Sequence, residues 1–75
     1  MRTYNLFRGK GQNALFCAVP EERSVPSFLT SRRWEFSGRL DGQQRRPRGF
    51  DFKAARAASR FNGYYFFLDF ERKSA

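Results

Sequence analysis

The residues of this sequence with the clearest capacity for binding chemistry are cations that lie close together. Lys53, Arg56 and Arg60 recur at positions i, i+3 and i+7 of an alanine-rich segment. On a helix this spacing places all three side chains on one stripe. Three further cations come shortly before that segment: Arg45, Arg46 and Arg48. Surfaces that contact phosphates have this composition, so the six residues predict a site for nucleic acid or for another acidic partner.

The charge of the whole chain favours the same interpretation. The 75 residues include fifteen Lys and Arg against seven Asp and Glu, which gives a net charge of +8. Most of the cations are Arg, whose planar guanidinium donates two hydrogen bonds to a phosphate or carboxylate and stacks on flat rings. Two alternatives stay open. The cations on the predicted helix face could form a solvated surface that keeps an aromatic protein in solution. The excess of Arg over Lys could reflect a preference of GC-rich coding sequences for Arg codons.

Catalytic and metal-binding chemistry find little support in the sequence. It has no histidine, and Cys17 is its single cysteine, so neither an internal disulfide nor a zinc site of the Cys/His type can form. Glu21 and Glu22 are adjacent and diverge rather than face one another. The Gly9-Lys10-Gly11 segment is too short for a phosphate-binding loop. We therefore expect no enzyme activity, no cofactor and no metal.

Aromatic residues are the second unusual feature. Ten Phe, three Tyr and one Trp make up 19% of the chain. Each buries about 150–250 Å², so a few can fill the core of so short a chain. The aromatic residues beyond those that the helix can cover must be shielded from water in another way. The alternatives are the segment around Phe28 and Leu29, a second subunit, or a ligand. The residues expected at such an interface are Phe7, Phe16, Tyr65 and Phe67.

The first half of the chain predicts a hairpin and a less regular segment. Thr3–Arg8 alternates as a half-buried strand, residues 9–13 form a turn, and Ala14–Val19 is apolar on both faces, as in a central strand. Pro20 ends that strand. Residues 20–32 allow two interpretations. They could form one helical turn capped by Ser24, or an irregular loop anchored by Val25, Phe28 and Leu29.

A third strand and a basic loop follow. Trp34–Leu40 is predicted as a strand with one wet face, because Trp34, Phe36 and Leu40 alternate with polar residues. Residues 43–49 are polar and basic and contain Pro47, so they predict an exposed loop.

The last part of the chain predicts a helix and a closing strand. Asp51 is expected to cap a helix from Phe52 to Phe61, with Phe52, Ala55, Ala58 and Phe61 toward the core and Gly63 ending it. Phe50 and Phe52 are expected to anchor the start of that helix in the core. Tyr64–Phe70 reads as a strand that pairs centrally, and residues 71–75 as a frayed polar tail.

Together these elements predict an α+β fold in a single domain, residues 1–75. The order is strand, strand, strand, helix, strand, with one helix packed on one face of a mostly antiparallel four-stranded sheet. The sequence shows no signal peptide and no run of apolar residues long enough to span a bilayer. We therefore expect a cytoplasmic protein with no membrane partner.

Two functions remain after these exclusions. The leading hypothesis is a small basic module that contacts nucleic acid non-specifically through the Arg-rich loop and the helix. The alternative is a protein-binding module that docks an acidic protein surface, either alone or as a homodimer through its aromatic sheet face. Such a module could be a small regulator or inhibitor of the kind that bacterial phages and mobile elements encode.

Overall fold

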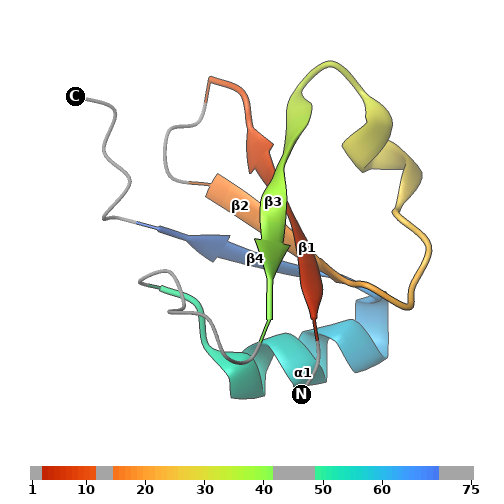
Figure 1. Ribbon diagram of the computed structural model, residues 1–75, viewed down its shortest axis with the longest axis vertical. Coiled ribbons are helices and arrows are strands. Elements are labelled where there is room, and N and C mark those ends of the chain that lie inside the picture. Colours follow the sequence, from red (N-terminus) through yellow and green to blue (C-terminus); the bar gives the residue numbers. More distant parts are fainter. Residues whose placement is uncertain (1–2, 12–14, 42–48, 70–75) are drawn as a thin grey trace.

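The protein folds as a four-stranded antiparallel sheet with one α-helix against it. The computed structural model describes residues 3–11, 15–41 and 49–69. The strands lie in the order β3-β1-β2-β4, and each pairs antiparallel with its neighbours (Figure 1). This confirms the predicted α+β class. The elements are β1 (Tyr4–Gly9), β2 (Leu15–Pro20), the 3-10 helix η1 (Ser27–Thr30), β3 (Trp34–Leu40), α1 (Phe52–Asn62) and β4 (Tyr65–Leu68).

The hairpin of β1 and β2 forms the middle of the sheet. Its register runs from Tyr4 opposite Pro20 to Arg8 opposite Phe16. Residues 16–20 of β2 are all buried, which confirms the prediction of a central strand that is apolar on both faces. Phe16 and Ala18 pack on one side of the sheet and Cys17 and Val19 on the other. The period of two along β2 thus feeds two separate apolar clusters.

Strand β3 has its predicted bounds, but its face assignment was wrong. Phe36 pairs with Phe7 while Gly38 pairs with the preceding residue of β1, so Ser37 is an extra residue in a β-bulge. A bulge shifts the alternation by one residue. As a result Leu40 is buried in the helix-side cluster, whereas Phe36 lies on the opposite face with 60% of its surface exposed.

The termini of α1 follow the sequence signals. The Asp51 carboxylate accepts the backbone N–H groups of Lys53 (2.9 Å) and Ala54 (3.2 Å), and Gly63 ends the helix in the left-handed region at φ 88°. The predicted inward position of Phe61 was wrong, since this ring is 88% exposed. Nine residues correspond to two and a half helical turns, so Phe61 points away from Phe52. The inward residues are Ala55 and Ser59.

Strand β4 lies at an edge of the sheet, not in its centre as predicted. Among the described residues it pairs with β2 alone, with Phe67 opposite Phe16. The backbone at Gly49 approaches β4 closely, since a Cβ there would lie 1.8 Å from the Leu68 carbonyl oxygen. Only glycine fits that approach, and at φ 92° it also adopts the left-handed region. The chain therefore enters α1 directly beside β4.

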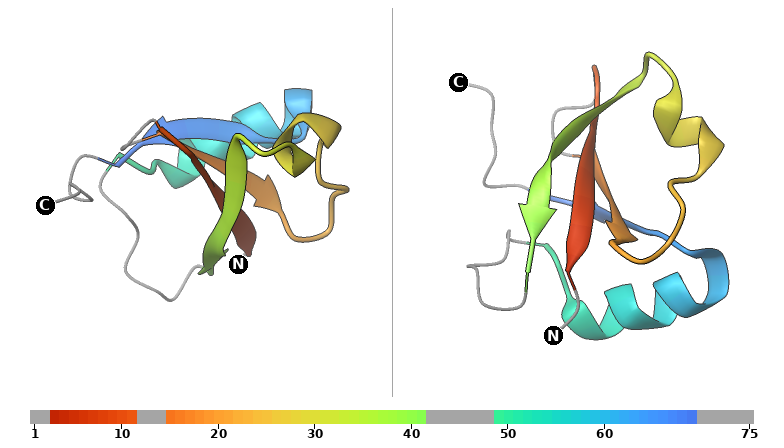
Figure 2. Two further views of the ribbon diagram at one scale, coloured as in Figure 1. Left: turned by 90° about the horizontal axis from the view of Figure 1, so that it is seen from above. Right: turned by 45° about the vertical axis from the view of Figure 1, so that its right-hand side comes forward.

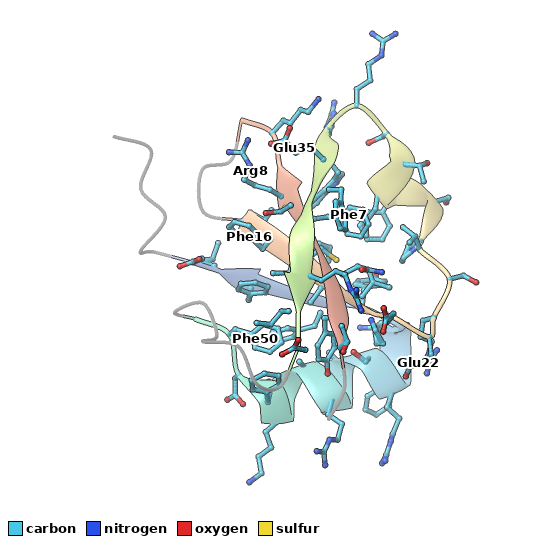
Figure 3. The ribbon with its side chains drawn as sticks, in the orientation of Figure 1. Phe7, Arg8, Phe16, Glu22, Glu35 and Phe50 are labelled. Carbon is cyan, nitrogen blue, oxygen red and sulfur yellow. The ribbon has the colours of Figure 1, made fainter. Side chains whose placement is uncertain are left out.

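The helix-side core is mostly aromatic. Phe50 lies at its centre, with ring centroids 5.5 Å from Tyr4 and 5.0 Å from Phe67 (Figure 3). Phe52 packs edge-on against Phe50 at 4.9 Å, which confirms that these two residues anchor the start of the helix. The buried members of this cluster are Tyr4, Leu6, Phe16, Ala18, Leu40, Phe50, Ala55 and Phe67.

The opposite face is covered in part by residues 20–32. Within this segment Ser27–Thr30 forms the 3-10 helix η1, whose N-cap residue is Pro26. No side chain caps the start of this helix by a hydrogen bond, so the predicted Ser24 cap was wrong. Leu29 is buried with Cys17 and Val19, as an anchor should be. Phe28 packs on Trp34 and Tyr64, although 37% of its surface stays exposed.

The sheet is strongly twisted, so that β4 crosses β3 at a steep angle (Figures 1 and 2). This twist brings Trp34 of β3 within 5.9 Å of Phe66 of β4, measured between ring centroids, although two strands separate β3 and β4 in the sheet. No helix within residues 3–11, 15–41 and 49–69 is long and apolar enough to cross a membrane.

Candidate nucleic-acid interface

The helix α1 presents the three predicted cations to solvent. Lys53, Arg56 and Arg60 are all exposed. At 3.6 residues per turn their positions fall within an arc of about 60°, and they extend over about 10 Å of the helix axis. We call these three residues the basic stripe. The sequence prediction that they share one exposed face is therefore consistent with the structure.

The helix can expose the basic stripe because another side of it contacts the sheet. Ala55 and Ser59 are buried there, and α1 contacts β4 and β2. The basic stripe is centred about a third of a turn from this buried side. Nitrogen-tipped side chains extend from the helix away from the sheet in Figure 3. A flat or grooved partner could therefore approach the stripe without disturbing the core.

The basic stripe is not neutralised within the described part of the chain. Two ion pairs occur there, Arg8 with Glu35 and Arg39 with Glu21, and both use cations of the strands. A side-chain hydrogen bond and the positive charge of Arg8 hold the pKa of Glu35 below its usual range. Asp51 is the acid nearest the stripe in sequence, and its carboxylate is engaged by the helix N-terminus. Because Asp51 already accepts hydrogen bonds from backbone amides at the start of α1, a phosphate would contact the basic stripe and not these amides.

Three of the six predicted cations precede the helix in the sequence. Arg45, Arg46 and Arg48, with the predicted exposed loop at 43–49, lie outside the described residues except for Gly49. The same holds for the predicted tail at 71–75. In the sequence Arg48 precedes the Asp51 cap by three residues, so a contribution of the three arginines to the same surface stays a prediction.

The aromatic residues predicted at an interface belong largely to the core. Phe16 is 1% exposed and Phe67 is 5% exposed, and their rings stack at 5.4 Å. Tyr65 is half-buried and packs against the same cluster. Phe7 is half-buried on the other face, where it meets Phe36 edge-on at 5.7 Å. Phe16, Tyr65 and Phe67 lie on the side of the sheet that faces the helix, which covers them, whereas an interface role for Phe7 stays a prediction.

Three other apolar residues of the sheet are exposed. Phe36 is 60% exposed, Phe66 44% and Leu68 45%, although the alternation in residues 34–40 predicted a core face for Phe36. For Phe36 a signal was present, since a glycine inside a strand, here Gly38, often marks a bulge. For Phe66 and Leu68, alternation along β4 separates two faces, but which of these faces the helix covers depends on the tertiary packing.

The described residues supply little for covalent or metal chemistry. Burial raises the pKa of the Cys17 thiol to about 12, so this thiol stays protonated at neutral pH. No group of three or more His, Cys, Asp or Glu side chains that could hold a metal ion occurs among these residues.

Comparison with known proteins provides no homologue from which to transfer a role. No protein-family model, curated protein or solved structure matches the chain. Function is therefore inferred from the surface chemistry of α1 and of the sheet.

Proposed function

We propose that the protein is a small basic binding module that contacts the phosphates of nucleic acid through the basic stripe, without reading sequence. Arg45, Arg46 and Arg48 complete this surface in the proposal. The observation that carries it is the alignment of Lys53, Arg56 and Arg60 on one exposed helix face with no ion-pair partner among the described residues. When such cations neutralise the phosphates of a nucleic acid, they release the counterions that had condensed on it, and this release favours binding.

The geometry favours backbone contact over base readout. The α1 helix has eleven residues, and its inward side is held by the sheet. The exposed stripe consists of long cationic side chains, which suit phosphates. Its neighbours on the outer surface include two alanines, Ala54 and Ala57, which carry no hydrogen-bonding groups. Binding should therefore vary little with base sequence.

Two single substitutions that each remove one positive charge test this proposal. Arg56→Gln removes one cation of the basic stripe, whereas Arg39→Gln removes one cation of β3, which lies at the other edge of the sheet from β4. Fluorescence anisotropy with a labelled DNA duplex at low salt should show several-fold weaker binding for Arg56→Gln and little change for Arg39→Gln. Equal losses in the two variants would show that only net charge matters and would refute a localised interface.

A protein-binding module is the second candidate, and the exposed sheet residues favour it. Phe36, Phe66 and Leu68 expose large apolar surfaces that typically mark contact sites. Such a module would dock an acidic protein surface or a second copy of itself through this aromatic face. Chromatography with light scattering would then show an assembly that is free of nucleic acid and indifferent to salt. A monomer that elutes with nucleic acid at low salt would favour the basic stripe.

A further inference from the structure

A pocket lies at the end of the sheet where β1 turns toward β2 and β3 begins. It encloses about 370 Å³ and is lined by Gly9, Lys10, Gly11, Leu15, Arg33 and Trp34. This volume falls at the lower end of the range for small-molecule sites, which is about 300–1,000 Å³. None of the residues of the basic stripe lines it.

The lining combines an aromatic ring with two cations. Trp34 is half-buried, and its ring is held by Phe28 at 6.2 Å and by Phe66 at 5.9 Å between centroids. Lys10 and Arg33 are both exposed at the pocket. The Lys10 backbone N–H donates to the Arg33 carbonyl oxygen at 2.7 Å, which fixes the two cationic residues beside one another. A rigid ring beside two cations suits a flat, anionic ligand.

The surrounding residues leave room for such a ligand and do not cancel its attraction. Gly11 is exposed and carries no side chain, so it adds no bulk to the pocket lining. The nearby carboxylate of Glu35 accepts a hydrogen bond from the Arg8 Nε at 2.9 Å. Glu35 attracts both Arg8 and Lys10, but three cations, Arg8, Lys10 and Arg33, stand against this one carboxylate, so a net positive charge remains at the pocket.

We propose that this pocket binds one nucleotide unit, with its base against Trp34 and its phosphate between Lys10 and Arg33. The nucleotide could be free or part of a single strand, since both present a base and an adjacent phosphate. The inference deepens the proposed function, and it depends on that function only where the nucleotide belongs to a strand. It assigns a second contact, distinct from the basic stripe, at which stacking contributes as well as charge.

The single tryptophan of the chain makes the pocket directly measurable. Trp34 is the only Trp of the chain and lines the pocket, so tryptophan fluorescence reports on the surroundings of this one residue. Titration with adenosine 5′-monophosphate should quench or shift the emission saturably. Adenosine and inorganic phosphate, which each carry half of the ligand, should bind more weakly. Inorganic phosphate as effective as the nucleotide would overturn the proposed stacking on Trp34.

Two double variants with the same charge change separate this pocket from the basic stripe. Lys10→Gln with Arg33→Gln changes two exposed side chains and keeps Trp34, and it should weaken nucleotide binding about tenfold or more. Lys53→Gln with Arg60→Gln should leave nucleotide binding unchanged while it weakens duplex binding. Equal nucleotide affinity in the wild type and the pocket variant, or no nucleotide binding by equilibrium dialysis, would overturn the inference.

The same titrations distinguish the failure of the two proposals. If the nucleotide binds but duplex DNA does not, the proposed function fails and the pocket stands. If Lys53→Gln with Arg60→Gln weakens duplex binding but the nucleotide does not bind, the pocket fails and the basic stripe stands. Competition with oligothymidylate identifies the source of the nucleotide. Displacement of adenosine 5′-monophosphate from the wild type shows that the pocket accepts a strand, and retention shows a site for free nucleotides.

Discussion

The side chain of Ser59 is a polar group buried among apolar residues on the inward side of α1. It is fully buried between α1 and the sheet, and its hydroxyl has no hydrogen-bond partner within the described residues. A buried hydroxyl without a partner destabilises the folded state, and alanine also favours the helix. We predict that Ser59→Ala raises the free energy of unfolding by about 1 kcal/mol, measured by urea denaturation. A lower stability in the variant would indicate that this hydroxyl is satisfied.

Cys17 gives the stability a defined pH dependence. Its pKa rises from 9.0 to about 12 on folding because the thiol is buried. Since the thiol of the unfolded chain ionises first, the neutral buried form stabilises the protein fully below about pH 9, and this contribution is lost as the pH rises toward 12. The loss amounts to about 1.4 kcal/mol per pH unit within that window.

Comparison with Cys17→Ala isolates this contribution from the Lys and Tyr groups that also titrate at alkaline pH. Urea unfolding at several values from about pH 8 to about pH 10 should show the wild type losing stability more steeply than the variant. Parallel pH profiles for the two proteins would contradict the burial of Cys17.

At the scale of elements, the entry into α1 depends on a glycine at a close backbone approach. A Cβ at Gly49 would lie 1.8 Å from the Leu68 carbonyl oxygen, whereas one at Gly11 would meet nothing within 4 Å, and both residues have positive φ. We predict that Gly49→Ala lowers the free energy of unfolding by about 2–4 kcal/mol, from strain and displacement of β4. Gly11→Ala should cost about 1 kcal/mol, from the backbone conformation alone.

Both variants can be compared by urea denaturation, with Gly11→Ala as the control for left-handed backbone strain. Similar losses in the two proteins would mean that residue 49 does not pack against β4.

The order and type of the elements could be predicted because their signals are local. Asp51 and Gly63 bracket the helix, and the apolar run of β2 marks a buried strand. The assignment of faces could not be predicted in the same way. One extra residue at Ser37 moves Phe36 to the face opposite Leu40, and sequence alternation alone does not count that residue.

Long-range packing explains the other differences. The position of β4 at the sheet edge depends on its pairing with β2, which lies far away in the sequence. The exposure of Phe61, by contrast, follows from helix periodicity, since nine residues span two and a half turns. For the candidate site, the basic stripe could be predicted from its spacing, whereas the pocket at Trp34 could not, because β3 and the β1–β2 turn meet only in the folded chain.

At the scale of the whole molecule, the net charge of +8 makes attraction to polyanions expected, so binding alone is a weak test. What the structure adds is a location. The basic stripe lies on α1, while the two cations that pair with acids within the described residues, Arg8 and Arg39, lie on the strands. A localised interface makes a definite number of phosphate contacts, and this number is measurable.

The most direct test is the salt dependence of binding to a DNA duplex, compared between the wild type and the triple variant Lys53→Gln, Arg56→Gln, Arg60→Gln. The logarithm of the binding constant should fall linearly with the logarithm of the salt concentration, with a slope that loses about 0.9 for each contact removed. Three contacts therefore predict a slope about 2.7 shallower in the variant. Equal slopes in the two proteins, or binding by the wild type that is indifferent to salt, would contradict an interface on α1.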